Sequence, residues 1–362
     1  MLRVCLVGLI AGGHSGIPRY AAALSAGLDR VAPEFPDLSL RLLTTPRGAA
    51  AAGVERLPVE RVEGRFAHAY SGPRRILADQ VLARSADADL LHFFDLTGPV
   101  LAPRTPFVAT IHDAAAVHGF EPVRMAYKRI LQPWAVRRAR AVVAVSAFAR
   151  AEAVRMLRAD PTRVRVIHSG PGLLARTDDT APTGSRYVLY VGNLAVHKNL
   201  PFLVDAFGAA GVDARLLLVG SRGDRFHEVR AAIEASPARD RIEVRTDADD
   251  AEVDRLYRGA TMLALPSRYE GFGFTALEAM ARGCPVLASD IPALREVSGA
   301  GAMLLPTGQR DAWAHAIRRV FFDRGVREEL RRRGRATASL YSWERTGREI
   351  CELLREVGRG LA

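Results

Sequence analysis

The amino-acid sequence predicts an α/β protein made of two doubly wound, parallel-sheet domains that face a cleft. Short apolar runs alternate with amphipathic helical segments from end to end, which is typical of parallel βαβ units. The 362 residues are enough for each of two domains to bury its own core. A polar stretch that opens at Ser169-Gly170-Pro171-Gly172 and runs to Ser185 breaks the alternation, so we place the linker there.

The two halves are expected to share one plan, with strands and helices in alternation. The expected domains are residues 1–172 and 173–340, followed by a terminal segment, 341–362. In the first domain the pattern predicts strands at 2–10, 38–44, 89–94, 107–111, 141–145 and 164–167, and helices at 16–30, 122–139 and 147–158. In the second domain it predicts strands at 187–191, 215–219, 242–245, 261–265, 285–288 and 302–305, and helices at 199–209, 225–235, 250–258, 275–282, 310–322 and 326–337.

Composition excludes several classes of protein. Hydrophobic residues make up 49% of the chain and charged residues 25%, as in globular proteins, and no apolar run reaches the length of a transmembrane helix. The apolar start, Val4 to Ala11, runs directly into a glycine-rich loop, so we interpret it as a strand and not as a signal peptide. Cys5, Cys284 and Cys351 are too far apart and too few for a disulfide framework or a metal cluster, which favours a reducing, cytoplasmic location.

Basic residues are concentrated in the first half of the chain. The net charge is +11, and residues 1–172 contribute +9 of it, with 23 basic and 14 acidic residues. Such a balance suits nucleic acid, an anionic membrane or an acidic substrate. We do not expect a nucleic-acid partner, because no recognition motif accompanies the charge.

One predicted helix of the first domain combines basic and apolar residues at helical spacing. Two interpretations stay open: the apolar residues face the core beneath solvated arginines, or the basic face holds the protein on the inner, anionic surface of the plasma membrane. The basic residues are Arg124, Lys128, Arg129, Arg137, Arg138 and Arg140, and the apolar ones are Met125, Ile130, Leu131, Trp134 and Val136.

Functional residues are expected where strands end and helices begin, because open α/β sheets bind ligands at the carboxyl ends of their strands. In the first domain, Gly12 to Tyr20 is a glycine loop whose Gly16 could approach a phosphate, or it is simply a tight turn. The loop lacks G-x-G-x-x-G, and no carboxylate ends the second strand, which argues against a dehydrogenase. His112 and Asp113 close an apolar strand, where His112 is either structural or a partner for a substrate hydroxyl.

In the second domain, two segments of this kind stand out. The first, Tyr190 to Leu200, holds Lys198, one of only two lysines; it is either a point charge for a phosphate or an ordinary solvated lysine. The second, Ser267 to Met280, carries Glu270 and Glu278 on either side of a glycine-rich turn into a helix. Carboxylates accept hydrogen bonds from vicinal hydroxyls, and the helix N-terminus attracts anions, so this turn suits a sugar beside a phosphate.

The segment E-G-F-G-F-x-x-L-E-A-M resembles the E-x7-E motif of the family 4 retaining glycosyltransferases. That family has the GT-B fold, in which two Rossmann-like domains face a cleft. The resemblance extends over nearly the whole chain. Its landmarks, in order, are Thr110-Ile111-His112-Asp113, Ala144-Val145-Ser146, Val166 to Gly172, Gly192 to Leu200, the E-x7-E block itself, Gly283-Cys284-Pro285-Val286 to Glu296, and Tyr341-Ser342-Trp343, which resembles the segment that crosses back to the first domain.

The resemblance implies a nucleotide-diphosphate sugar held mainly by the second domain and an acceptor held mainly by the first. Carried over by position, Glu270 would bind hydroxyls of the donor sugar and Glu278 would bind those of the ribose. Gly273, Phe274 and Thr275 would bind sugar and phosphate through their backbone. Thr275 replaces a proline that is common in the family, a change we expect to be tolerated.

The remaining roles implied by the resemblance concern the phosphates and the transferred sugar. Lys198 would neutralise the diphosphate, His112 would lie near the donor sugar and Gly16 would approach the phosphates. Asn193 would bind the donor too, but the family often has a basic residue where Asn193 stands, so Lys198 is expected to carry more of the phosphate charge. The context His197-Lys198-Asn199 is similar to that of bacterial mannosyl- and deoxyhexosyl-transferases, which makes GDP-mannose the first expected donor. The expected acceptor is a hydroxyl of a glycan, a lipid-linked sugar or a natural product.

The implied reaction is front-face substitution with retention of configuration, with Glu270, Lys198 and His112 as its catalytic residues. We expect no cofactor, because the nucleotide sugar is itself a substrate, and we expect metal independence. Two D-x-D segments, Asp87-Ala88-Asp89 and Asp247-Ala248-Asp249, match a metal-binding motif only formally. Two alternatives stay open: a GT-B nucleotide-sugar epimerase or disaccharide phosphorylase, and a catalytically inactive partner subunit.

Overall fold

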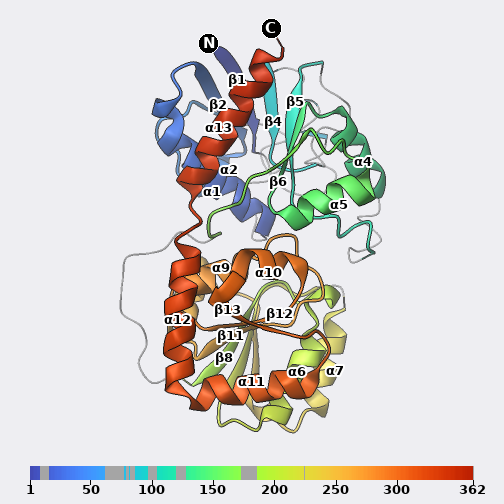
Figure 1. Ribbon diagram of the computed structural model, residues 1–362, viewed down its shortest axis with the longest axis vertical. Helices are drawn as coiled ribbons and strands as arrows, with labels where there is room; N and C mark the ends of the chain where they lie inside the picture. The colour runs from blue at the N-terminus through green and yellow to red at the C-terminus, as the bar shows by residue number, and fades with distance from the viewer. Residues whose placement is uncertain are drawn as a thin grey trace. The chain divides into compact units, whose positions relative to one another are not determined.

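Two parallel β-sheets organise the chain, each with helices packed against it (Figure 1). The computed structural model describes residues 1–8, 16–61, 77–78, 81, 86–96, 104–119, 128–172, 186–223 and 225–361. By its internal contacts the chain divides into unit 1, Met1–Gly172 with Tyr341–Ala362, and unit 2, Leu173–Leu340. Over the described ranges, no helix is long and apolar enough to cross a lipid bilayer.

The sheet of unit 1 has the strand order β3-β2-β1-β4-β5-β6-β7. Its central strands are buried along nearly their whole length, because helices cover both faces of a parallel sheet, and their sequences are therefore continuous apolar runs. The order reverses between β1 and β4, which creates a topological switch point. The strands are β1 (Leu2–Val7), β2 (Leu38–Thr44), β3 (Val59–Arg61), β4 (Leu90–Phe93), β5 (Phe107–Ile111), β6 (Ala141–Ala144) and β7 (Val164–Val166).

Unit 2 repeats this arrangement in a six-stranded parallel sheet of order β10-β9-β8-β11-β12-β13. Its switch point lies between β8 and β11, which pair in parallel through Met262 with Val188 and Leu263 with Leu189. The loops that follow these two strands therefore begin side by side. The strands are β8 (Tyr187–Val191), β9 (Arg215–Val219), β10 (Ile242–Arg245), β11 (Met262–Leu265), β12 (Val286–Ser289) and β13 (Ala302–Leu305).

Side-chain caps mark where some of the helices begin. Ser146 caps α5 and Asp249 caps α8 through side-chain bonds to the third backbone N–H of each helix. In unit 1 the helices are α1 (Gly16–Val31), α2 (Pro46–Ala52), α4 (Lys128–Arg138), α5 (Ala147–Leu157) and α13 (Trp343–Arg359). In unit 2 they are α6 (Leu200–Ala210), α7 (Phe226–Ala235), α8 (Asp250–Gly259), α9 (Phe274–Ala281), α10 (Pro292–Ser298), α11 (Arg310–Phe322) and α12 (Arg324–Ala338).

The last helix of the chain packs on the first, so unit 1 is built from both ends of the sequence (Figure 1). Gly27 on α1 makes this close approach possible, since a Cβ there would lie 2.5 Å from the backbone oxygen of Trp343. The Trp343 side chain is buried, and its Nε1 donates a hydrogen bond of 2.7 Å to the backbone oxygen of Pro171. Trp343 therefore ties the start of α13 to the end of the first half of the chain.

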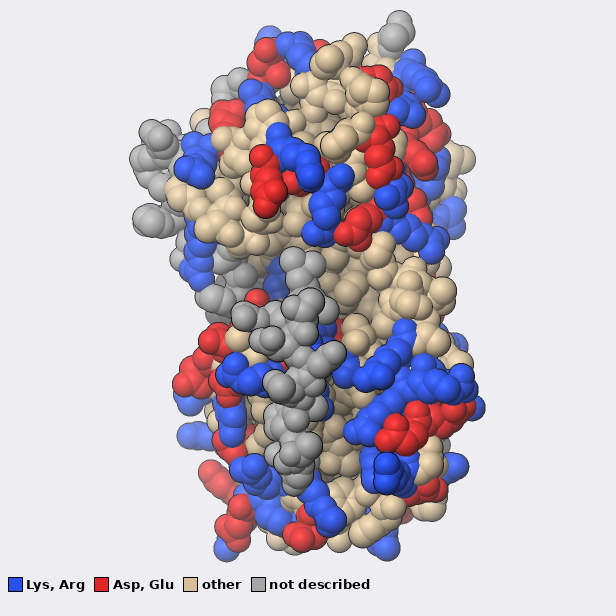
Figure 2. Space-filling model, turned by 90° about the vertical axis from the view of Figure 1, so that its left-hand side faces the viewer, with Lys and Arg blue, Asp and Glu red and all other residues tan. Residues whose placement is uncertain are grey.

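Ion pairs line the exposed side of α13. Arg348 donates to Glu34 at 2.7 Å, and Arg355 donates to Asp37 at 2.6 Å. Figure 2 shows basic and acidic side chains interspersed over the part of unit 1 that faces the viewer. Because these groups are largely exposed to water, the pairs orient α13 more than they stabilise it.

Most predicted elements are present, but the sequence analysis missed three short ones. It missed β3, α2 and α10, which span only three or seven residues and are too short for apolar spacing to distinguish helix from strand or loop. The predicted strand 2–10 ends at Val7, and residues 9–15 lie outside the described part of the chain, as do 122–127 of the predicted helix 122–139 and the expected linker 173–185. The described portion of that helix begins at Lys128.

Candidate active site

The carboxyl ends of β8 and β11 bring the two strongest predicted residues of unit 2 into contact. Lys198 lies in the turn between β8 and α6, and Glu270 lies in the loop between β11 and α9. The Nζ atom of Lys198 donates a hydrogen bond of 2.7 Å to Oε1 of Glu270. Their side chains are 17% and 16% exposed, so the pair is shielded from bulk water yet still reachable by a ligand.

The electrostatics of this pair keep Glu270 ionised. Burial by itself raises the pKa of the Glu270 carboxyl, but the charge and hydrogen bond of Lys198 outweigh it. The nearby His197 and a 2.7 Å hydrogen bond from Oγ of Ser267 act in the same direction. The net result is a pKa below the ordinary value, so Glu270 accepts hydrogen bonds as a carboxylate. Ser267 was not among the predicted site residues; its place next to the Glu270 loop was the available signal.

Close backbone packing fixes the loop that carries Lys198. A Cβ at Gly220, which follows β9, would lie 1.8 Å from the backbone oxygen of Gly192, which follows β8. Asn199 adopts a φ of 57° at the entry to α6, a left-handed conformation that asparagine tolerates better than most residues. The glycine after β9 was a signal that sequence reasoning overlooked.

The predicted residue Asn193 contributes its backbone to this loop. Its side chain is exposed, and its backbone oxygen accepts a 2.8 Å hydrogen bond from the Tyr190 hydroxyl. Burial raises the pKa of Tyr190 well above its ordinary value, which keeps that hydroxyl protonated as a donor. The geometry therefore gives Asn193 a structural role in the turn, and its side chain is open to solvent.

The start of α9 has the features of an anion-binding helix N-terminus. Gly273 precedes the helix with a φ of 109°, a conformation that favours glycine, and no side chain caps the helix there. The N–H groups of Phe274 and Thr275 belong to the first turn, which has no partners within the helix. Glu270 lies three residues before Gly273. The carboxylate that can accept hydrogen bonds from sugar hydroxyls is therefore close in sequence to the N–H groups that can donate to an anion.

Glu278 lies one further turn into α9 and is 2% exposed. Its Oε2 accepts a hydrogen bond of 2.9 Å from the hydroxyl of Tyr257 on α8. A second contact joins this region, because Asp254 on α8 accepts a hydrogen bond from Arg282, the residue that follows α9. The structure thus adds Tyr257 as a residue that orients Glu278.

Three of the four carboxylates of the two D-x-D segments have other partners in the structure. Asp87 and Asp89 both accept hydrogen bonds from the guanidinium group of Arg3, at 2.7 and 2.8 Å. Asp249 caps α8 by accepting a hydrogen bond from the backbone N–H of Glu252.

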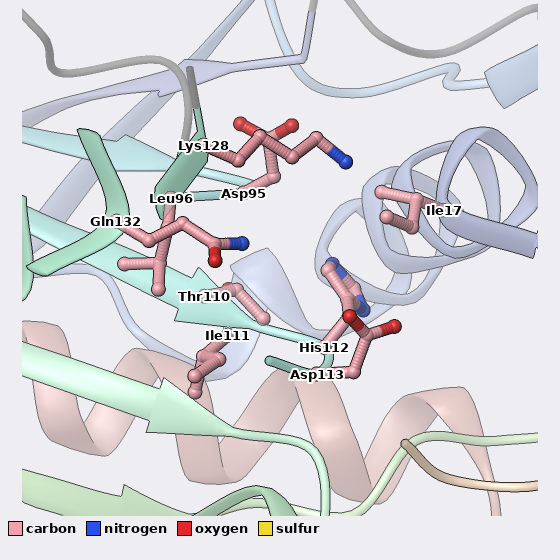
Figure 3. Close-up of a pocket in the computed structure, with 9 residues that line it drawn as sticks. All are labelled: Ile17, Asp95, Leu96, Thr110, Ile111, His112, Asp113, Lys128 and Gln132. Carbon is pink, nitrogen blue, oxygen red and sulfur yellow. The ribbon is translucent and has the colours of Figure 1, made fainter. Parts of the chain in front are cut away.

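In unit 1, His112 lies directly after β5 and lines a pocket at the switch point of the sheet (Figure 3). Its Nε2 is 2.9 Å from the backbone oxygen of Phe94, which can only accept, so Nε2 carries the proton. Burial lowers the pKa of His112, and the ring is therefore neutral with Nδ1 as a hydrogen-bond acceptor. The ring of Tyr20 packs edge-on against it with centroids 4.5 Å apart.

The remaining residues of unit 1 complete this picture. Gly16 is exposed at the start of α1, and Gly12 to Ser15 of the predicted glycine loop lie outside the described residues. His92 is fully buried in β4, where its ring lies beside the Thr110 hydroxyl. Burial lowers the pKa of His92 to about 3, so it is a neutral structural residue of the core. The structure thus places His112 in unit 1 and Lys198, Glu270 and Glu278 in unit 2.

Comparisons with known proteins agree with this arrangement. Two family models match the chain: "Glycosyltransferase Family 4" over residues 15–171 and "Glycosyl transferases group 1" over residues 175–337. The GDP-mannose:cellobiosyl-diphosphopolyprenol alpha-mannosyltransferase of Komagataeibacter xylinus is 28% identical over 85% of this chain and 80% of that protein. The D-inositol 3-phosphate glycosyltransferase of Salinispora tropica is 28% identical over 93% and 76%.

Solved structures share the fold. Sucrose-phosphate synthase from Thermosynechococcus elongatus superposes with a TM-score of 0.76 over 99% of this chain and 100% of that chain, at 21% identity. At this identity the similarity concerns the backbone arrangement of the sheets and helices.

Proposed function

The chain belongs to the glycosyltransferases of family 4 and group 1, retaining enzymes of the GT-B fold that use nucleotide-diphosphate sugars, and we propose that Lys198 and Glu270 form the centre of its donor site. The observation that carries the proposal is their 2.7 Å contact at the switch point of unit 2. An ammonium group has three donors, so Lys198 can hold Glu270 and a phosphate oxygen at once. The donor sugar and its diphosphate then contact neighbouring groups of the loops that follow β8 and β11.

The same groups account for the chemistry of the transfer. Negative charge builds on the diphosphate as the bond to the sugar breaks, and fixed positive groups stabilise it there. Lys198 supplies a full charge, and the N–H groups of Gly273, Phe274 and Thr275 at the start of α9 supply partial ones. Glu270 holds the hydroxyls of the sugar, and the departing phosphate oxygen takes the proton of the acceptor hydroxyl. No side-chain nucleophile is needed.

Two further residues complete the proposed binding of substrates. Glu278 accepts hydrogen bonds from the ribose, in an orientation set by Tyr257. His112 accepts a hydrogen bond from a substrate hydroxyl through Nδ1, because its Nε2 proton is already used on Phe94. Gly16 at the start of α1 remains a candidate for close approach of a phosphate.

The proposed donor is GDP-mannose. The His197-Lys198-Asn199 context and the similarity to a GDP-mannose-dependent enzyme support this choice. The test is a thermal-shift panel of GDP, UDP, ADP and dTDP. A ligand that binds the folded state raises its melting temperature, and the tightest ligand raises it most, so we expect the largest shift with GDP. If another nucleoside diphosphate gives a larger shift, the donor carries the nucleobase of that diphosphate and not guanine. If none of them gives a shift, the proposed donor site is wrong.

The stereochemical outcome follows from transfer on one face of the sugar. With an α-linked donor, we expect an α-linked product by NMR and equal activity with and without EDTA. Arg3 engages Asp87 and Asp89, and Asp249 caps α8, which supports the metal-independent proposal. A β-linked product, or activity that returns only with Mn²⁺, would contradict this mechanism. Product analysis with and without acceptor separates transfer from epimerisation and phosphorolysis.

We also propose that α4 rests on an anionic membrane, beside a lipid-linked acceptor. Ile130 on this helix is 74% exposed, and the guanidinium of Arg138 lies 5.0 Å from the ring centroid of Trp134. Arg129 and Arg137 are exposed too, and α4 contains no acidic residue. Basic groups beside exposed apolar ones are typical of helices that lie on membranes. Arg124 and Met125 of the predicted stripe lie outside the described residues.

Sedimentation with vesicles tests this surface. The protein is expected to pellet with anionic vesicles at low salt and to be released at high salt, since each basic residue near such a surface contributes about 1 kcal/mol. The double variant Arg137→Glu/Arg138→Glu should lose this binding. The matched control, Arg332→Glu/Arg333→Glu, makes the same charge change at exposed positions of α12 and should retain it. Equal pelleting with neutral and anionic vesicles, or none with either, would refute the membrane contact.

A further inference from the structure

Ser267 is a buried serine in the loop between β11 and α9, just after the end of β11. Its hydroxyl group donates a hydrogen bond of 2.7 Å to Oε1 of Glu270. In the described part of the chain, this is the only hydrogen bond that the Ser267 side chain makes. The hydroxyl therefore serves the Glu270 carboxylate and not the backbone of the loop.

A separate contact holds the backbone of this loop. The N–H group of Arg268 donates a 2.8 Å hydrogen bond to the backbone oxygen of His197, in the turn that carries Lys198. This bond joins the loop after β11 to the turn after β8, directly beside Ser267. Because a serine has a single torsion before its oxygen, a fixed backbone leaves the hydroxyl only a few positions. The donor to Glu270 is thus positioned in advance.

Both donors of Glu270 bind the same carboxylate oxygen. Nζ of Lys198 and Oγ of Ser267 each lie 2.7 Å from Oε1. A carboxylate oxygen offers two lone-pair sites, so these two bonds occupy Oε1. Oε2 has no donor in the described part of the chain, and it does not belong to the polar atoms there that are sealed from solvent. A ligand hydroxyl can therefore reach Oε2.

The second donor limits how the carboxylate moves. The terminal torsion of a glutamate is broad and two-fold, so a carboxylate with one donor can exchange its two oxygens. Lys198 alone is a flexible point charge, which can follow this rotation or bridge both oxygens. The fixed hydroxyl of Ser267 removes that freedom, since it keeps Oε1 on the side of Lys198. Oε2 then stays open to the sugar, and the other N–H groups of Lys198 stay open to a phosphate.

We propose that Ser267 is a positioning residue of the donor site, whose hydroxyl holds Oε1 of Glu270 beside Lys198 and so reserves Oε2 for the hydroxyls of the donor sugar. This inference rests on the proposed function and deepens it, because it assigns the two oxygens of one carboxylate to different partners. Ser267 acts through Glu270 and needs no contact with the substrate. Its effect is therefore confined to the sugar part of the donor.

The test compares binding of a nucleotide sugar with binding of its nucleoside diphosphate, by calorimetry on the full chain. The probes are GDP-mannose with GDP and UDP-glucose with UDP, and the pair that binds the wild type is used. Ser267→Ala is expected to bind the nucleotide sugar about tenfold more weakly, because a hydrogen bond to a charged group is lost. Its affinity for the diphosphate should change by less than about twofold. Ser298→Ala removes another buried serine hydroxyl of unit 2, at the end of α10, and should bind both probes like the wild type.

A double variant separates positioning from a general loss of structure. In a Glu270→Ala background the acceptor of the Ser267 hydroxyl is gone. Adding Ser267→Ala to it should therefore weaken nucleotide-sugar binding by less than about twofold. A folding defect would persist in that background and would weaken binding of the diphosphate as well.

The pH dependence of binding is an independent measurement. Besides Ser267, the groups that act on the charge of Glu270 are Lys198, His197 and Tyr190, and all three remain in the variant. The hydrogen bond from Ser267 lowers the pKa of the Glu270 carboxyl, so Ser267→Ala raises that pKa. As the solution is acidified, the affinity of Ser267→Ala for the nucleotide sugar should begin to fall at a higher pH than that of the wild type.

The inference is overturned by any of four results. Ser267→Ala binds the nucleotide sugar like the wild type, it weakens the diphosphate to the same extent, its effect is undiminished without the Glu270 carboxylate, or its acid limb coincides with that of the wild type. A wild-type protein that binds neither pair of probes contradicts the donor site itself, and the inference falls with it.

Discussion

Replacing Lys198 by alanine is expected to lower kcat about 100-fold, because the variant loses the charge that stabilises the departing diphosphate. Binding of the ground-state donor should weaken less than turnover, since the leaving group gains charge only as the bond breaks. Steady-state kinetics with the intact protein measure both effects. Lys198→Arg keeps the charge and should retain much of the activity, although its planar group cannot copy the ammonium geometry.

Because Lys198 also contacts Glu270, a loss of activity in Lys198→Ala has two possible causes, the lost contact with the diphosphate and the changed Glu270. Lys198 lowers the pKa of the Glu270 carboxyl, so the alanine variant also removes a charge that keeps Glu270 ionised. If Lys198 acts on the diphosphate, the double variant Lys198→Ala/Glu270→Gln should be much slower than Glu270→Gln alone. If the second substitution adds nothing, or if Lys198→Ala turns over like the wild type, the phosphate role is wrong.

Glu270→Gln is expected to lower kcat roughly 10- to 100-fold while the affinity for the nucleoside diphosphate changes by less than about twofold. The glutamine keeps the size of the side chain and one acceptor oxygen, but it removes the negative charge that holds the sugar hydroxyls. Calorimetry with GDP and turnover with the complete donor give the two numbers separately.

A control for this change lies where α8 meets the end of α9. Arg282 pairs with Asp254 in the interior, so Asp254→Asn also neutralises a buried, ion-paired carboxylate of unit 2, away from the proposed sugar contacts. We expect it to reduce stability more than turnover. Should Glu270→Gln impair GDP binding as strongly as turnover, Glu270 would be part of the nucleotide contact and not of the sugar contact.

The sequence predicts strands better than it predicts contacts between distant side chains. The strands β2, β5, β8, β9, β10 and β13 occupy the predicted ranges, and most of them are buried apolar runs bounded by polar turns. Lys198 and Glu270 were singled out from their own loops, and their contact across 72 residues became visible only once β8 and β11 were neighbours. Pairing of loops depends on strand order, which local patterns do not contain.

Helix packing accounts for another omission. Tyr257 reads as one apolar position of an amphipathic helix, and its bond to Glu278 depends on how α8 lies against α9. Tyr257 orients Glu278 through its hydroxyl group alone, which the periodicity of hydrophobic residues does not detect.

The return of α13 to unit 1 has a consequence for the order in which the protein folds. During synthesis, the side of α1 around Gly27 stays uncovered until Trp343 and the residues after it leave the ribosome. At typical elongation rates, translating residues 173–362 takes roughly 10 to 40 s, and during this time unit 2 is complete before unit 1 is. The domain encoded first is therefore the one finished last, with an apolar surface that must be kept from aggregation while it waits.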